Sequence, residues 1–358
     1  MRRVVLIIPF KRISLFLIPL LFLTQSPAAS AESAPSVSAA SCVLMYEDGQ
    51  MLYARCAEEK SLIASTTKLM TALVCLENTK LEDSVRVSAT ACAVEGSSVG
   101  LRAGESYSVR ELMLGLLLAS GNDAALALAE HVSGSVQAFV GLMNQKAEAL
   151  GLTHTHFANP HGLDAPEHFS TANDLARLML VCMQNERFCE LIASPSMSLD
   201  GKVYLNHNRL LRSCPGCIGG KTGYTMAAGR CLVSCCERAG LRFVCVTLSD
   251  PDDWKDHWAL YDWAFRSYRA FDPGKELRLR VPAISGDRKE IAVEPLETKR
   301  TLIPAQETVR LEAELPRFIF APVKKGETAG KIRVIIKQKT AAEYTLVYSE
   351  TVNPAVQM

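Results

Sequence analysis

The chain contains the stretch Ala64-Ser65-Thr66-Thr67-Lys68-Leu69-Met70-Thr71-Ala72-Leu73. Small residues lead into an unbroken apolar run, a pattern that predicts the start of a helix. Residues three apart lie on one helix face, so the Ser65 hydroxyl and the Lys68 amine can meet. Burial of that face would favour the neutral amine, which can accept the hydroxyl proton and make the serine a nucleophile. Alone, the same pattern also fits an N-cap beside a solvated lysine.

Two further short segments follow in order. Ser120-Gly121-Asn122 comes after the apolar run 112–119, and Lys221-Thr222-Gly223 comes after Gly219-Gly220. Taken separately, the first fits a capped loop and the second a surface turn. Ser-x-x-Lys, then Ser-x-Asn, then Lys-Thr-Gly is, however, the signature of the penicillin-recognising serine enzymes.

The sequence resembles the D-alanyl-D-alanine carboxypeptidases of serine peptidase family S11, which are low-molecular-mass penicillin-binding proteins. The resemblance covers about residues 41–269 and, more loosely, the C-terminal part. It implies an α+β fold of the β-lactamase/transpeptidase type, with an antiparallel sheet and a helical cluster, followed by a small all-β domain. It implies no metal or cofactor. The other segments that carry it are Asn159-Pro160-His161-Gly162-Leu163-Asp164, Ser170-Thr171-Ala172-Asn173-Asp174-Leu175-Ala176, Tyr224-Thr225 and Ala228-Gly229-Arg230-Cys231-Leu232.

The resemblance implies four catalytic residues. Ser65 attacks the carbonyl of a terminal D-Ala-D-Ala bond and is acylated, Lys68 is the base, and water then releases the shortened peptide. Ser120 relays the proton to the leaving amine, and Asn122 holds Lys68 and the substrate amide. The implied partners are peptidoglycan stem peptides that end in D-Ala-D-Ala, with β-lactams as covalent inhibitors.

The Lys-Thr-Gly segment is implied to bind the free C-terminal carboxylate of the substrate, through the charge of Lys221 and the hydroxyl of Thr222. Its glycines let the substrate lie against the strand as an added strand. The backbone N–H groups of Ser65 and Tyr224 are implied to form an oxyanion hole. The implied substrate-binding residues are Lys221, Thr222, Gly223, Tyr224 and Thr225.

The N-terminal residues have the pattern of a secretory signal peptide. Early arginines precede an apolar stretch at 13–23, and a small-x-small cleavage motif follows at Ala29-Ser30-Ala31. An uncleaved anchor is the alternative. The signal indicates an exported protein, in the cell wall or at the outer face of the cytoplasmic membrane; association with that membrane stays open. The predicted organisation is a signal peptide (1–31), a disordered lead-in (32–40), a catalytic domain (41–272), an all-β domain (273–350) and a tail (351–358).

The local patterns predict a hairpin over 42–54 that turns at Asp48-Gly49. An aromatic helix follows the central strands, and Trp254, Trp258, Tyr261 and Phe265 recur along it at the spacing of a core stripe. Beyond residue 272, alternating apolar and polar residues predict half-buried strands. The remaining predictions are helices at 109–120, 122–132, 135–151 and 171–184, strands at 230–236 and 241–248, and the aromatic helix at 253–269.

The net charge of +1 gives no indication of a nucleic-acid partner.

Of the twelve cysteines, several are expected in the core. Cys214 and Cys217 are the best candidates for a disulfide, with free thiols or a metal site as alternatives. The Gly-x-Ser-x-Gly motif of the α/β-hydrolase nucleophile elbow is matched by Gly96-Ser97-Ser98-Val99-Gly100. The segment lacks the strand before it and the helix after it that such an elbow requires, so a loop is expected. The histidines at 154, 156, 161 and 168 are expected to serve turns and packing.

Two other functions share these motifs. A β-lactamase would use the same chemistry with fast deacylation, but Ser-Gly-Asn in place of Ser-Asp-Asn and the appended domain disfavour it. A non-catalytic wall protein that holds stem peptides is the other alternative, and the complete set of motif side chains disfavours it.

Met226 departs from the small or acidic residue that relatives often have there. The C-terminal residues 352–358 lack the amphipathic membrane-docking helix of many relatives.

Overall fold

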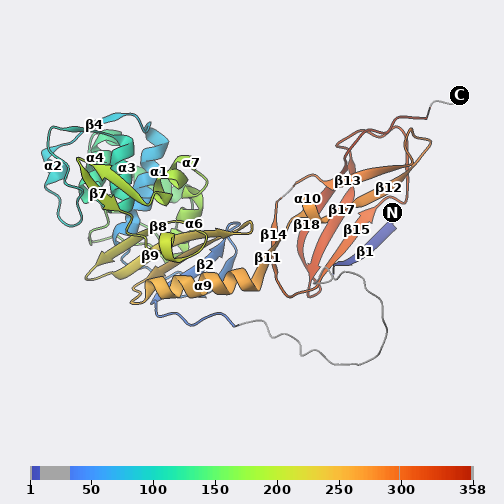
Figure 1. Cartoon of the computed structure of the whole chain (residues 1–358), viewed down its shortest axis with the longest axis horizontal. Helices are drawn as coiled ribbons and strands as arrows, with labels where there is room; N and C mark the ends of the chain where they lie inside the picture. The colour runs from blue at the N-terminus through green and yellow to red at the C-terminus, as the bar shows by residue number, and fades with distance from the viewer. Residues whose placement is uncertain (1, 9–32, 298, 356–358) are drawn as a thin grey trace. The chain divides into compact units, whose positions relative to one another are not determined.

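The computed structural model describes residues 2–8, 33–297 and 299–355. The chain divides into two compact units: residues 34–264, and residues 265–358 together with 1–33 (Figure 1). Each unit has its own hydrophobic core. The division lies before the predicted boundary at residue 272, because β11 (Tyr268–Phe271) pairs with β14 (Thr301–Pro304) of the second unit.

The first unit is built on a five-stranded antiparallel sheet with the strand order β3-β2-β10-β9-β8. The predicted hairpin is present, with Asp48 and Gly49 between β2 and β3. β8 is an edge strand, so one side of its backbone is not paired within this sheet. The strands are β2 (Ser41–Tyr46), β3 (Met51–Arg55), β8 (Cys217–Thr225), β9 (Gly229–Arg238) and β10 (Leu241–Leu248).

Side-chain alternation along β9 gives this sheet two different faces. Val233 and Cys235 belong to the core that the sheet shares with the helical cluster. Ser234, between them, points to the other face, where its Oγ lies 2.7 Å from His257 Nδ1 and 2.8 Å from Tyr261 Oη. Both partners belong to α9 (Asp253–Ser267), so α9 covers the face opposite the helical cluster.

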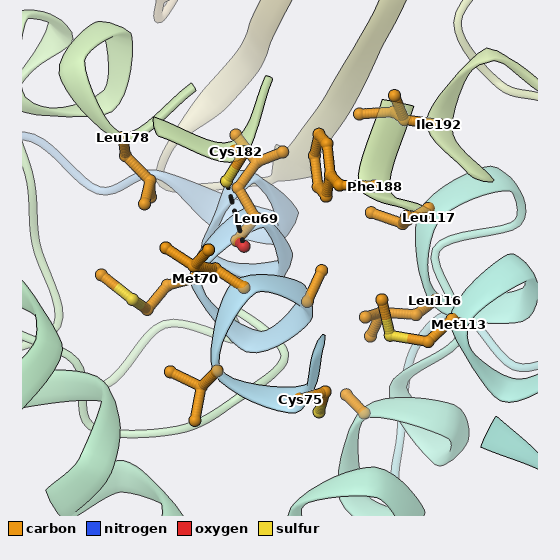
Figure 2. Close-up of a cluster of buried hydrophobic side chains, with 14 of the residues drawn as sticks. Leu69, Met70, Cys75, Met113, Leu116, Leu117, Leu178, Cys182, Phe188 and Ile192 are labelled. Carbon is orange, nitrogen blue, oxygen red and sulfur yellow. Dashed lines mark hydrogen bonds between the residues drawn. The ribbon is translucent and has the colours of Figure 1, made fainter. Parts of the chain in front are cut away.

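Helix α1 (Lys68–Asn78) lies at the centre of the helical cluster, and its residues are almost entirely buried. Figure 2 shows apolar side chains of α3, α6 and α7 around it, with the Cys182 thiol 3.7 Å from the Leu69 carbonyl oxygen. A 3-10 turn, η1 (Ala64–Thr67), precedes α1, so Ser65 lies just before the α-helix. The other helices are α2 (Ala89–Cys92), α3 (Val109–Leu118), α4 (Asn122–Ser133), α5 (Val136–Ala149), α6 (Ala172–Cys182), α7 (Glu186–Ala193) and α8 (Leu210–Ser213).

Two short hairpins complete the first unit: β4 (Ser84–Arg86) with β5 (Ser106–Ser108), and β6 (Ser196–Leu199) with β7 (Lys202–Leu205). Side chains cap the starts of several helices, among them α3, α5, α6 and α7. Ser108 and Glu111 form a reciprocal capping box at the start of α3. No helix in the described part of the chain is long and apolar enough to cross a membrane.

The second unit is dominated by a seven-stranded sheet with the order β1-β15-β17-β18-β13-β12-β16. Along β15, Val309, Leu311 and Ala313 are buried while Arg310 is exposed, as expected for a half-buried strand; Glu312 departs from the alternation because it is also buried. A short helix, α10 (Pro273–Glu276), precedes the sheet. The strands are β1 (Arg2–Ile8), β12 (Leu279–Ile284), β13 (Glu290–Pro295), β15 (Val309–Leu315), β16 (Ile319–Phe320), β17 (Thr328–Ile336) and β18 (Lys339–Tyr348).

Both ends of the chain depart from the sequence prediction. No strand was expected at β1, which pairs with β15, and most of the predicted signal (9–31) lies outside the described residues. In the predicted lead-in, the Ser38 hydroxyl donates to Asp250 Oδ1 at 2.7 Å, so this part is ordered by buried carboxylates. In the predicted tail, Val352 is buried and bridges to Val323.

The prediction that the aromatic residues of α9 form a core stripe is partly wrong. Tyr261 is fully buried, but Trp258 is 46% exposed, and Trp263 is buried in its place. The helix lies on the sheet along a line through His257, Tyr261 and Ala264, and Trp258 points away from that line. Aromatic spacing alone did not reveal the orientation of the helix, because polar groups on the sheet select the buried face.

Candidate active site

The structure brings Ser65 and Lys68 together, as their spacing predicts. Lys68 Nζ lies 2.8 Å from Ser65 Oγ, 2.7 Å from Asn122 Oδ1 and 2.7 Å from the His161 carbonyl oxygen. Lys68 is fully buried in the helical cluster. Burial, and then the nearby Lys221 ammonium, lower the pKa of the Lys68 amine well below its ordinary value. The site therefore favours an amine that carries no charge.

The amide orientation of Asn122 follows from its second partner. Its Nδ2 donates to the Glu95 carbonyl oxygen at 2.7 Å, so Oδ1 must be the atom that faces Lys68. The residue stands at the start of α4, directly after Ser120 and Gly121. Ser120 has a positive φ of 62°, an uncommon conformation for a residue with a side chain, which turns its hydroxyl toward the site.

Lys221 approaches the site from the sheet. Its Nζ donates to Ser120 Oγ at 3.0 Å and to the Thr222 carbonyl oxygen at 2.6 Å. The side chain is 1% exposed, and burial lowers the pKa of its amine to about 7. Two hydrogen bonds therefore join the three motif segments: Lys68 to Asn122 links the first segment to the second, and Lys221 to Ser120 links the third to the second.

Two glycines allow the backbone segments to meet around Ser65. A Cβ atom on Gly162, whose φ is +91°, would lie 1.9 Å from the Ala64 carbonyl oxygen. A Cβ atom on Gly223 would lie 3.0 Å from the Ser65 nitrogen. Strand β8 and the 159–164 turn are therefore pressed against η1 from two directions, and a side chain at Gly162 would push the turn away.

A cavity of about 450 Å³ opens beside the serine hydroxyl. Of the predicted site residues, Ser65, Ser120, Thr222, Gly223 and Tyr224 line it. Three other predicted site residues are buried and do not line the cavity: Lys68, Asn122 and Lys221. The other lining residues are Ser97, Leu205, Asn206, His207, Arg209, Arg212, Arg230, Asp253 and Trp254.

Thr225, a predicted substrate-binding residue, has its hydroxyl engaged within the protein. Its hydroxyl donates to Asp164 Oδ1 at 3.0 Å and accepts from the Ala228 backbone N–H at 3.0 Å, and it does not line the cavity. Side chains alternate along a strand, so Thr225 and Gly223 share a face while Thr222 and Tyr224 share the other. Thr225 holds the turn between β8 and β9.

Sequence reasoning missed several groups at the site. The 159–164 turn was expected to be only structural, but the His161 carbonyl oxygen accepts from Lys68 Nζ. Asp123 is 1% exposed, and its carboxylate accepts from the backbone N–H groups of Val99, Gly100 and Leu101. It thereby shapes the loop that contains Ser97. The acidic residue next to the Ser-x-Asn motif was a visible signal for such a role.

Trp254 was expected in the core and instead lines the cavity, together with Arg230. Arg230 donates to Asp253 Oδ1 at 2.7 Å, and its guanidinium lies 5.8 Å from the centre of a Trp254 ring. Cys214 and Cys217, the candidate disulfide pair, are not bridged in the structure, in agreement with the free-thiol alternative. All twelve cysteines are free thiols in the structure, and the Cys214 Sγ contacts Cys236, 3.8 Å away.

A hydroxyl paired with a buried lysine at the junction of an antiparallel sheet and a helical cluster defines the penicillin-recognising class of serine enzymes. The family model described as D-alanyl-D-alanine carboxypeptidase matches residues 28–252, and that of the penicillin-binding protein 5 C-terminal domain matches residues 265–354. The chain therefore belongs to the D-alanyl-D-alanine carboxypeptidase family, peptidase family S11. It is a serine-type carboxypeptidase, a hydrolase and a penicillin-binding protein, which confirms the predicted fold and activity.

Relatives match nearly the whole chain. The D-alanyl-D-alanine carboxypeptidase DacF of Bacillus subtilis is 33% identical over 89% of each chain. DacC of Escherichia coli is 36% identical over 93% of this chain and 89% of its own. The crystal structure of the D-alanyl-D-alanine carboxypeptidase DacD from Francisella tularensis has a TM-score of 0.72 at 26% identity, covering 93% of this chain and 98% of that one.

Proposed function

We propose that Ser65 is the nucleophile of this carboxypeptidase and that the neutral Lys68 amine is its base. The hydrogen bonds of Lys68 carry the proposal. A neutral amine has two N–H bonds and one lone pair, and Asn122 Oδ1 and the His161 carbonyl oxygen can only accept hydrogen bonds. These two acceptors use both N–H bonds, so the lone pair is left for the proton of the Ser65 hydroxyl at 2.8 Å.

The proposed reaction follows from this arrangement. Ser65 Oγ attacks the carbonyl carbon of the terminal D-Ala-D-Ala bond while its proton moves to Lys68 Nζ. The backbone N–H groups of Ser65 and Tyr224 stabilise the oxyanion. Ser120 relays a proton to the leaving amine, and Lys221, 3.0 Å from its hydroxyl, provides positive charge beside it. Water then hydrolyses the acyl-enzyme.

Substrate binding is proposed along the free edge of β8. This strand is last in the sheet order, so a peptide can add to it by main-chain hydrogen bonds. Thr222 lines the cavity and would bind the C-terminal carboxylate, with the charge of Lys221 behind it. A requirement for that carboxylate distinguishes a carboxypeptidase from an endopeptidase. Gly223 and Tyr224 complete the predicted binding strand.

The proposed substrates are peptidoglycan stem peptides ending in D-Ala-D-Ala, and the proposed site of action is outside the cytoplasm. Support comes from the family and from the predicted signal at residues 1–31. Removal of that signal would also remove β1, and β15 would then form a sheet edge of the mature protein. N-terminal sequencing of the exported protein, with Glu32 as the expected first residue, tests the cleavage.

The test of the catalytic assignment is a comparison of Ser65→Ala with the exposed control Ser213→Ala. The chain and the control are expected to release D-alanine from a D-Ala-D-Ala peptide and to form a stable adduct with labelled penicillin, which mass spectrometry places on Ser65. Ser65→Ala is expected to lose both. A folded Ser65→Ala variant that still releases D-alanine at the original rate would refute the assignment. Rapid loss of the penicillin adduct would instead indicate a β-lactamase.

A further inference from the structure

Three cysteines form a cluster outside the site described above. Cys214 follows α8, Cys217 is the first residue of β8, and Cys236 lies on β9. The Sγ atoms of Cys214 and Cys236 are 3.8 Å apart, and Cys217 and Cys236 are directly opposite each other in the β8–β9 pairing. Cys236 therefore lies next to both of the other cysteines.

The surroundings of Cys214 favour its thiolate. Arg238 Nη2 donates to Cys214 Sγ at 3.5 Å, and Arg238 Nε donates to the Pro215 carbonyl oxygen at 2.7 Å, which holds the guanidinium beside the sulfur. The hydrogen bond with Cys236 and the charge of Arg238 lower the pKa of Cys214 to about 7, against the effect of burial. A thiol of this kind reacts by exchange with disulfides.

The environment of Cys236 is different. Its side chain is fully buried, and burial and the neighbouring sulfurs raise the pKa of its thiol. Cys214 is itself 3% exposed, but it adjoins the exposed residues Pro215 and Gly216. Opening of this surface turn would give a small reagent access to Cys214. The pair thus combines an ionisable thiol near the surface with a protonated thiol behind it.

The contact with Cys236 also lowers the pKa of the Cys217 thiol, but the Cys217 sulfur accepts from Asn208 Nδ2 and not from a guanidinium. The cysteines outside this cluster lack the combination. Cys56 is exposed, and the neighbouring Glu59 raises the pKa of its thiol. Cys75 and Cys182 are buried in the helical core, and desolvation raises the pKa of each. No group of three or more His, Cys, Asp or Glu residues in the described part of the chain has the arrangement of a metal site. The cluster is therefore better suited to exchange chemistry than to metal binding.

We propose that Cys214 and Cys236 form a thiol–disulfide exchange site, which a small disulfide reagent oxidises to an intramolecular disulfide. The Cys214 thiolate attacks one sulfur of the reagent, forming a mixed disulfide and releasing one thiolate. That thiolate takes the proton of Cys236, whose sulfur then attacks Cys214 Sγ and displaces the second half of the reagent. Two protein thiols lose two electrons and two protons, and one disulfide reagent becomes two thiols.

The geometry leaves a short approach for the two sulfurs. A disulfide bond is about 2.05 Å long, so the sulfurs must close from 3.8 Å, a movement of the size that side-chain rotation provides. The bond would close a loop between positions 22 apart, which contains all of β8 and its Lys-Thr-Gly segment. The bond would thus tie the far end of the substrate-binding strand to β9, several residues from Thr222.

The test uses the full chain with Cys56→Ser, so that the exposed thiol does not form a mixed disulfide. The folded protein is incubated with oxidised glutathione, its remaining thiols are alkylated, and disulfides are located by peptide mapping. The expected result is a bond between Cys214 and Cys236, a mass that before alkylation is lower by about 2 Da than that of the reduced chain, and reversal by dithiothreitol. The oxidised protein is expected to melt about 5 °C higher, with its penicillin acylation rate unchanged.

Single cysteine variants then test whether the intramolecular disulfide depends on Cys214 in particular. Cys214→Ser is expected to abolish the intramolecular bond, whereas Cys217→Ser and the core control Cys75→Ser retain it. A bond between any other two cysteines, or no intramolecular bond, would overturn the proposal. Mapping of the chain with Cys56→Ser decides this even where a further variant fails to fold. The outcome is independent of the catalytic assignment, because acylation is measured separately.

Discussion

The two units of the molecule treat buried polar groups differently. In residues 34–264, both Lys68 and Lys221 are fully enclosed, and Asp123 is 1% exposed. In residues 265–355, Glu312 is the one buried polar or charged residue among those with described side chains. Burying a charge costs free energy unless it is compensated by partners. Two of these groups, Lys68 and Lys221, are hydrogen-bonded to the hydroxyls of Ser65 and Ser120, and this pairing indicates where chemistry takes place in the first unit.

The largest expected effect comes from replacing the buried Lys68 amine in the first unit. Lys68→Met keeps an unbranched side chain of similar length but removes the base, so we expect the rate of penicillin acylation to fall roughly 10²- to 10⁴-fold. Stopped-flow or gel-based labelling measures this rate. Glu312→Gln, the corresponding change in the second unit, is expected to leave it unaffected. If both variants acylate at the original rate, the contrast between the units has no bearing on catalysis.

A pair of glycines with similar backbone angles sharpens the comparison. Gly162 and Gly326 have φ values of +91° and +85°, but only Gly162 has neighbours in the way of a Cβ atom. We expect Gly326→Ala to cost roughly 1–2 kcal/mol of unfolding free energy from the backbone angle alone. Gly162→Ala is expected to cost roughly 3 kcal/mol or more, because the new methyl group collides with Ala64. Urea denaturation followed by circular dichroism measures both; equal losses would mean that the close packing around η1 is not required.

The next prediction concerns how the unfolding free energy of the first unit depends on pH through the buried amine of Lys221. The folded-state pKa of Lys221 is about 7, against an ordinary value of 10.5, so between these values the unfolded chain holds a proton that the folded chain lacks. Stability therefore rises with pH in this window, by up to about 1.4 kcal/mol per pH unit. Lys221→Met removes this contribution. The difference in unfolding free energy between the chain and this variant, measured from pH 7 to 10, is expected to rise; a constant difference would show that the amine is not desolvated.

The smallest effect concerns two threonines of β8. Thr222 lines the cavity, while the hydroxyl of Thr225 is engaged with Asp164 and the Ala228 N–H. Thr222→Val is expected to lower kcat/KM for a D-Ala-D-Ala peptide about tenfold or more, because a hydrogen bond to a carboxylate is lost. Thr225→Val is expected to lower it less than about threefold. Equal losses in the two variants would restore the sequence-based assignment of Thr225 to substrate binding.

Much of the fold could be predicted because the local patterns are strong. The Asp48-Gly49 hairpin, the helix after Lys68 and the alternating strands of the second unit all depend on interactions close in sequence. The predictions failed where distant contacts decide. Ser38 is ordered by Asp250 and Asp256, which lie more than two hundred residues away in the chain. The orientation of α9 depends likewise on polar groups of the sheet.

The site divides in the same way. Ser65 and Lys68 are three residues apart, so helical geometry places them together, and the order of the three motifs indicates the family. The carbonyl oxygen of His161 could not be recognised, because every residue has one and only the folded chain brings this one to Lys68. The same holds for the sulfur contact between Cys214 and Cys236.

The amino-acid sequence by itself determined which groups can react and which backbone segments carry them, since chemical identity and short-range periodicity are local properties. The tertiary structure decided the protonation of those groups and the partners they meet. Desolvation, which lowers the pKa of Lys68 and Lys221, depends on atoms contributed by the whole unit.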